Sequence, residues 1–368
     1  MTTDGKPIEK TSEEETEPRS GSPLVGVSRR SFLRGAAAGV VWSVASPWAA
    51  PWAYGGLSGL VGQYDAAVPN AHAQMLFRLV TSTPGFTPPV VSRVLGSFGF
   101  AVYESLVPGM PGYRSLHGLL PGFPQTPETP RSSMHWPTVA NHALGTVVRG
   151  LFPSDAPMLG VLRAMMNAID LESEVPAPIR RRSVDRGGKV ADMVLDWLAS
   201  DGGHEGYRRN FPASYVYPTG PGLWEPTPPD FQPVPLQPFW GENRPFVSSG
   251  CAAPPPPEYS VDPSSEFHGY ASEVYETSLT LTPDQTEIAL FWADDPGTVT
   301  PPGHSFSMLR QVLIAEDVSL DRAAEAYLRV GCCLADAFIQ CWPPNTSGIW
   351  SGQSRISVPI SIHCGPPS

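Results

Sequence analysis

The sequence has none of the short motifs that mark the common catalytic sites. It contains no GxSxG nucleophile elbow, no HExxH zinc helix, no phosphate-binding P-loop and no GxGxxG turn after a strand. Its eight histidines are scattered, and no two of them lie four residues apart on one helix face. These absences give no support to a serine hydrolase, a zinc protease or a nucleotide-binding enzyme.

Basic residues and paired cysteines are also scarce. The chain has 24 Lys and Arg against 35 Asp and Glu, for a formal net charge of -11, so no nucleic-acid partner is expected. The five cysteines are odd in number and lack CxxC spacing, so no zinc site is expected. Cys332, Cys333 and Cys341 fall in one expected helix, where disulfide geometry is rare, and we interpret them as small apolar core residues.

No segment shows the sustained alternation of apolar and polar residues that a strand needs, whereas helical periodicity recurs along the chain. The sequence therefore predicts an all-α fold, a helical bundle. A capping box, Thr282 to Gln285 with Pro283 at the first helical position, opens one of its helices, and we expect Ser319 to cap the longest. The expected helices cover residues 68–80, 87–106, 138–151, 157–171, 178–199, 282–292, 304–315 and 319–342.

Proline is the compositional excess, with 44 residues, and many of them lie in a long segment without periodicity, residues 202–262. So long a structureless stretch is unusual in a compact domain. Its aromatic residues are uncommon in free linkers, so we expect an ordered segment that wraps around the helices. These aromatic residues are Trp224, Phe231, Phe239, Trp240 and Phe246.

The N-terminal residues have the pattern of an export signal. Residues 1–27 are polar and acidic and are expected to be disordered. The paired Arg29 and Arg30, followed by Phe32 and Leu33 and then by an apolar run, resemble a twin-arginine signal within residues 28–53. The run is too short for a stable membrane span, so we predict export of the folded protein to the periplasm or the extracellular space.

Several short stretches between residues 64 and 342 keep the order of the motifs of one family. The ordered set resembles the bacterial two-domain vanadium-dependent haloperoxidases, which share a helical core with acid phosphatases and lipid phosphatases. The resemblance implies a vanadium haloperoxidase-like helical bundle and peroxide-driven halide oxidation, with a phosphatase-type hydrolase as the alternative. The stretches are Phe100 to Glu104, Pro108 to Ser115, His135 to Pro137, Trp224 to Pro229, Phe239 to Phe246, Phe291 to Ala293 and Ala335 to Phe338.

In that family vanadate is held by a lysine, two arginines, a histidine that binds the metal and the backbone of a P-S-G-H turn, while a second histidine acts as acid and base. Cationic donors are what an oxyanion needs. The family's K-x6-R-P element should follow the long helix, but no Lys follows Trp342, and the one Arg there, Arg355, is not followed by Pro. No catalytic, cofactor-binding or metal-binding residue is therefore carried over, and we expect this chain not to bind the family's vanadate.

Two further features are candidates for a site. Pro301 to Ser305 reads P-P-G-H-S and is similar to the P-S-G-H turn, but it precedes the long helix instead of following it. We interpret it as a mimic, a tight turn with His304 near a helix N-terminus. Asp336 lies on the apolar long helix and needs a partner if it is buried, in a structural contact or in a site. We interpret His72 as a structural or surface residue. His135 and His142 flank a helix start and could line a cleft, but we favour packing and capping roles for them.

Residues 343–368 break the helical pattern. Codons that encode Pro344 to Gln353 can also be read in a frame shifted by two nucleotides. With permissible choices of codon, that shifted frame can encode K-Y-E-W-Y-L-V-R-P, which has the K-x6-R-P spacing. A frameshift after Trp342 is therefore our hypothesis for this tail, and a genuinely divergent tail is the alternative.

These observations give a domain organisation and three functional hypotheses. After the signal we expect an N-terminal helical region at 54–201, a connection at 202–262, a second helical region at 263–342 and the aberrant tail at 343–368. The chain is a truncated haloperoxidase scaffold that is inactive as written, a phosphatase-type hydrolase, or a non-catalytic exported helical protein. An incomplete bundle exposes apolar surface, so the first hypothesis predicts a homo-oligomer or aggregate, whereas a soluble monomer favours the third.

Overall fold

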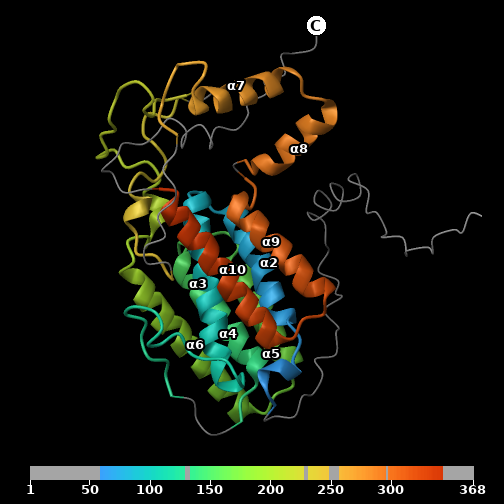
Figure 1. Ribbon diagram of the computed structural model, residues 1–368. Coiled ribbons are helices and arrows are strands. Elements are labelled where there is room, and N and C mark those ends of the chain that lie inside the picture. The colour runs from blue at the N-terminus through green and yellow to red at the C-terminus, as the bar shows by residue number, and fades with distance from the viewer. Residues whose placement is uncertain (1–58, 129–132, 228–230, 248–256, 296, 343–368) are drawn as a thin grey trace, which may run out of the picture. The chain divides into compact units, whose positions relative to one another are not determined.

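The computed structural model describes residues 59–128, 133–227, 231–247, 257–295 and 297–342. These residues belong to one compact unit, Trp52–Ser368. They contain α-helices and short 3-10 turns but no strand, which confirms the all-α prediction (Figure 1). The α-helices are α2 (Ala67–Ser82), α3 (Pro88–Leu106), α4 (Trp136–Leu151), α5 (Leu159–Glu172), α6 (Ala177–Ala199), α7 (Glu266–Leu279), α8 (Pro283–Ala293), α9 (Thr300–Ala315) and α10 (Leu320–Gln340).

Local sequence chemistry explains where several helices begin. Thr282 caps α8, and its side chain and that of Gln285 form the predicted capping box. Ser319 precedes α10 as expected, but its hydroxyl donates to the Asp321 carboxylate and does not cap the helix backbone. The sequence did not single out α7, since its apolar residues are interspersed with Gly, Ser and Glu.

Helix α3 lies at the centre of the bundle and is buried along almost its whole length. It packs most extensively against α10 and also contacts α4, α6 and α9 (Figure 1). Residues Pro88–Gly109 are long and apolar enough to cross a membrane, but they are buried inside the protein, as expected of a core helix.

Two glycines let α3 and α10 approach closely. A Cβ atom added to Gly99 on α3 would lie 2.6 Å from the Cα of Leu328, and one added to Gly331 on α10 would lie 2.5 Å from the carbonyl oxygen of Leu95. Both obstacles are backbone atoms, which cannot move aside as a flexible side chain can. The crossing therefore depends on the absence of a side chain at these positions.

Part of the proline-rich segment between α6 and α7 is packed against the bundle. Phe246 contacts the rings of Phe100 and Trp197, and the Arg244 guanidinium lies 4.1 Å from the centre of the Trp197 ring. Trp224 and Trp240 are also buried, whereas Phe231 and Phe239 are exposed. The described part of this segment therefore wraps the helices through some of its aromatic residues only.

Helices α7 and α8 differ from the rest because neither contains a buried residue. They have no extensive packing against another described element. The interpretation of the α10 cysteines as core residues was partly wrong, since Cys332 is buried but Cys333 and Cys341 are exposed. The face of α10 that carries Cys333 is turned away from α3.

Candidate functional site

The residues predicted to direct export, Arg29, Arg30, Phe32 and Leu33, lie outside the described residues, as does the tail 343–368. The sequence predicted no catalytic residue. The motifs that it singled out supply the candidates for a functional site. The strongest candidate is His304, from the P-P-G-H-S stretch.

His304 is the fifth residue of α9, so its predicted place near a helix N-terminus is confirmed, but Pro301 to Ser305 is helical and the predicted tight turn is wrong. Its Nδ1 atom donates to the carboxylate of Asp294, at 3.0 Å from Oδ2. The Trp292 indole stacks on the imidazole with the ring centres 4.7 Å apart, and Phe291 meets it edge-on. The last residues of α8 and the first turn of α9 thus hold the imidazole by a carboxylate and two aromatic rings.

The backbone around His304 is strained. Asp294 and Thr300 have φ values of 46° and 67°, in the left-handed region, which is a genuine outlier for the β-branched Thr300. The Thr300 hydroxyl oxygen is buried without a hydrogen-bond partner. Strain of this kind persists only where the surrounding structure imposes it, and it clusters at functional sites.

The chemistry around His304 does not suit vanadate or another oxyanion. A helix N-terminus binds anions through its free backbone N–H groups, but Pro301 and Pro302 have none. The Asp294 carboxylate adds negative charge, and the sequence has no Lys or Arg from residue 245 to residue 309. The residues of this site therefore do not fit the group that the family resemblance implies.

A second polar cluster lies inside the bundle, where α2, α4 and α5 meet. The Asn141 amide donates to the Met166 carbonyl and to Asp170, so its oxygen accepts from Nε2 of His72 at 2.8 Å. His142 Nε2 donates to the other oxygen of Asp170, at 2.7 Å. The sequence did not reveal this cluster, because its members are far apart in the chain and meet only when the helices pack.

Burial sets the proton affinity of two histidines in and beside this cluster. His72 is fully buried, and burial lowers its pKa to about 4, although the bond to Asn141 opposes the shift. Burial also lowers the pKa of His135 to about 4. Both imidazoles are therefore buried among the helices and neutral at pH 7.

Two buried carboxylates accept hydrogen bonds that fix loop segments to the bundle. Asp336 on α10 accepts hydrogen bonds from the backbone N–H groups of Phe246 and Val247, at 2.6 and 2.9 Å, and so fixes the wrapping segment to the bundle. Glu104 on α3 accepts from Ser115 and from the Leu116 N–H, and holds the loop that follows α3. Burial raises the pKa of the Glu104 carboxyl above its usual range.

One hollow on the described surface has a volume of about 580 Å³ and adjoins α6. Its one basic side chain, Lys189, already pairs with Asp185, and Asp192 and Asp196 add negative charge. This hollow does not offer the converging cations that an oxyanion needs.

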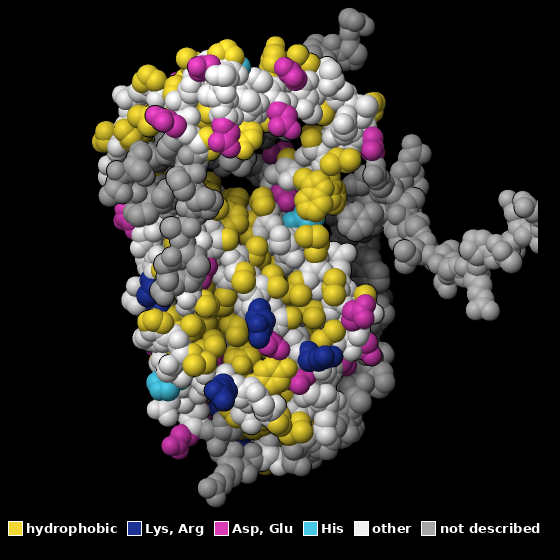
Figure 2. Space-filling view, in the orientation of Figure 1, with side chains coloured by type: hydrophobic (Ala, Val, Ile, Leu, Met, Phe, Trp, Pro, Cys, Tyr) yellow, Lys and Arg dark blue, Asp and Glu magenta, His cyan; other side chains and the backbone are white. Residues whose placement is uncertain are grey.

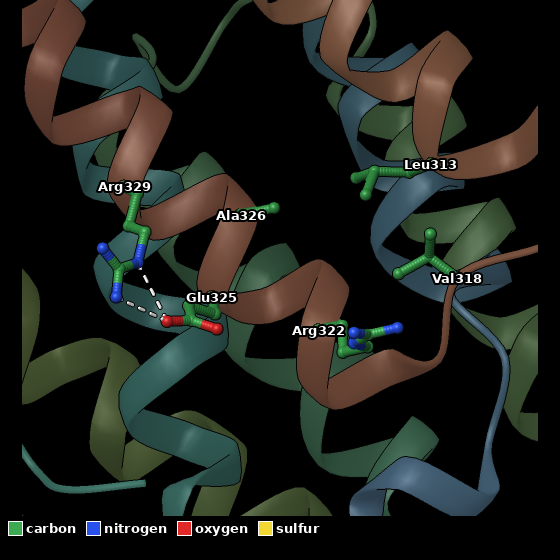
Figure 3. Close-up of a pocket in the computed structure, with 6 residues that line it drawn as sticks. All are labelled: Leu313, Val318, Arg322, Glu325, Ala326 and Arg329. Atoms are coloured by element: carbon green, nitrogen blue, oxygen red, sulfur yellow. Dashed lines mark hydrogen bonds and ion pairs between the residues drawn. The ribbon is translucent and has the colours of Figure 1, made fainter. Parts of the chain in front are cut away.

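The other hollow is an open groove of about 340 Å³ between α9 and α10 (Figure 3). Its apolar side chains come from both walls, and Arg329 pairs with Glu325 within α10, at 2.7 Å. The lining residues are Leu313, Val318, Arg322, Glu325, Ala326 and Arg329. Within the described part of the chain, no group of three or more His, Cys, Asp or Glu side chains is arranged to hold a metal ion.

No protein-family model and no curated protein matches the chain. Among solved structures, it is similar to the crystal structure of a bacterial vanadium-dependent iodoperoxidase, with a TM-score of 0.65 and 26% sequence identity. The match covers 76% of this chain and 68% of that chain. The fold of this protein is thus that of a vanadium haloperoxidase-like helical bundle.

Proposed function

We propose that this chain is the N-terminal scaffold of an exported haloperoxidase-type oxidoreductase, whose family uses vanadate to oxidise halides with peroxide. The observation that carries the proposal is the likeness to a vanadium-dependent iodoperoxidase over 76% of the chain. The short motifs between residues 64 and 342 also support it, because they keep the order of the motifs of that family.

We further propose that the 368 residues do not by themselves form the vanadate site. The sequence offers no K-x6-R-P element after α10, and the P-P-G-H-S stretch pairs its histidine with a carboxylate where the oxyanion would need a cation. An anion at this position would be repelled by Asp294 at short range.

Vanadate binding and halide oxidation test the two parts of the proposal together. We expect orthovanadate to give no saturable signal in vanadium NMR or calorimetry with the purified chain, and peroxide and iodide to form no triiodide above the rate without protein. Saturable vanadate binding with vanadate-dependent triiodide formation would show that the site is present. If that activity survived in His304→Gln, the P-P-G-H-S stretch would not be its source. Hydrolysis of p-nitrophenyl phosphate that vanadate inhibits would favour the phosphatase alternative instead.

Export by the twin-arginine route is a separate proposal with its own test. We expect replacement of both arginines, Arg29→Lys with Arg30→Lys, to leave the protein in the cytoplasm of a bacterial host that has the pathway, because the receptor reads this pair. Fractionation and immunoblotting measure the distribution. Arg34→Lys, in the same basic stretch but outside the pair, is the matched control and should be exported. Equal export of the double variant and the wild type would refute this signal assignment.

A further inference from the structure

Two surfaces of this chain carry apolar side chains that no described residue covers. The first is the arm, defined as α7 and α8. Phe267, Tyr270 and Val274 lie on one face of α7 at helical spacing. Phe267 packs against the ring of Tyr259, whereas Tyr270 and Val274 are 56% and 66% exposed. Tyr275 and Leu279 continue this apolar face. Helices of this length are marginal in water unless an apolar face is packed, so the arm gains stability from a partner.

The arm is also uniformly acidic. Glu266 and Glu273 lie beside Tyr270 at one edge of the apolar face of α7, whereas Glu276 lies on the opposite side of the helix. No Lys or Arg occurs between residues 245 and 309. Figure 2 shows acidic and hydrophobic side chains over α7 and α8, without basic ones. A partner for this surface therefore combines apolar side chains with positive charge, which excludes nucleic acid and an anionic membrane.

The second uncovered surface is the α9–α10 face, which includes the open groove. Met308 and Val312 on α9 are 42% and 57% exposed, and the outward side of α10 adds Val330 and Leu334, which are partly exposed, and the exposed Cys333. Figure 2 shows this face as largely hydrophobic, with a few basic side chains and neighbouring acidic ones within it.

Two of those basic side chains belong to α10. Arg322 and Arg329 both line the groove and are exposed, about two turns apart on the same helix (Figure 3). Arg329 forms an ion pair with Glu325 within the helix. A single exposed ion pair of this kind contributes little to stability, so Arg329 can leave Glu325 for another carboxylate. The α9–α10 face therefore combines an apolar strip with neighbouring arginines, and these are the two properties expected of a partner for the arm.

We propose that the chain forms a two-fold dimer in which the arm of each copy packs on the α9–α10 face of the other. The apolar face of α7 covers Met308, Val312 and Val330 of the second copy, and Glu266 and Glu273 at its edge face Arg322 and Arg329 of that copy. A two-fold axis forms both contacts at once, so both uncovered surfaces of each chain are buried in a closed assembly. Arm-to-arm pairing is disfavoured, because it would bring like charges together.

Cross-linking between differently tagged copies tests the arrangement directly. In a background where Cys251, Cys341 and Cys364 are serine, one copy carries Val274→Cys and Cys333→Ser, and the other keeps Cys333. We expect a short bismaleimide to link the two copies in the mixture. Leu171→Cys in place of Val274→Cys is the control, since Leu171 is 75% exposed but lies on α5, and it should not cross-link. Equal cross-linking from Val274→Cys and from Leu171→Cys would overturn the proposal. A chain that carries both Val274→Cys and Cys333 should also link to a second copy, and a link that forms only within one chain would overturn the proposal as well.

Sedimentation of the full chain tests the role of charge. We expect the full chain to form a dimer. The variant Arg322→Glu with Arg329→Glu should lower its association constant by about tenfold, because the contacts of these two positions with the acidic arm of the other copy become repulsive. Adding Glu266→Arg and Glu273→Arg to the same chain should restore the wild-type affinity. Arg163→Glu with Arg181→Glu, on exposed positions of α5 and α6, is the matched control and should leave it unchanged. A monomer at every concentration, or a dimer indifferent to the α10 reversal, would contradict the model.

Discussion

Replacing Gly331 by alanine is expected to lower the free energy of unfolding by about 3 kcal/mol, the upper end of what overpacking usually costs. The added Cβ would lie 2.5 Å from the carbonyl oxygen of Leu95 and 3.1 Å from the Cα of Gly96, so α10 must shift away from α3. This crossing is the most extensive helix contact of the described residues. A shift there therefore loosens the centre of the bundle. Urea unfolding followed by circular dichroism measures the loss.

A second glycine provides the control for this substitution. Gly188 is also in the interior of a helix, α6, but a Cβ there meets nothing within 4 Å. Gly188→Ala is expected to stabilise the protein by about 0.5 to 1 kcal/mol through helix propensity alone. If Gly331→Ala behaved like Gly188→Ala, the helices would not be in the close contact described.

Acid is expected to destabilise the protein steeply between pH 6.5 and pH 4. The pKa of His72 is lowered from 6.5 to about 4 by burial, so the unfolded chain binds its proton first as the pH falls. Above pH 6.5 the histidine is neutral in both states and has no effect. Below that pH the folded state loses stability progressively, and by pH 4 the loss reaches about 3 kcal/mol for this residue. His135, with its pKa also lowered to about 4, adds to the loss in the same window.

His72→Gln isolates this contribution. A glutamine amide can donate to Asn141 as Nε2 of the histidine does, but it does not titrate. Relative to wild type, we expect the variant to lose less stability between pH 7 and pH 4, by about 2 to 3 kcal/mol. His204→Gln, at an exposed position, is the control and should follow the wild-type profile. Parallel profiles for His72→Gln and the wild type would show that His72 is not buried as a neutral group.

The sequence predicted some residues of the candidate site but not the partners that these residues contact. The sequence singled out His304 and Asp336, because a histidine in a P-S-G-H-like stretch and a carboxylate on an apolar helix are unusual locally. It could not supply their partners. Asp294 is ten residues from His304 and lies beyond the end of another helix, while Asp336 bonds to a backbone 89 and 90 residues away. Such pairs form through packing and leave no signal in local spacing.

The amino-acid sequence by itself determined the all-α class and most of the helices, because helical periodicity, capping residues and proline positions act over a few neighbouring residues. It also carried the family resemblance, since that rests on the order of short motifs. Only the tertiary structure decided which faces of those helices are covered. The cysteines of α10 show the reason: Cys332 and Cys333 are adjacent in sequence and chemically identical, yet one is buried and the other is exposed. Burial depends on which neighbour a helix meets, and that is a property of the whole packed bundle.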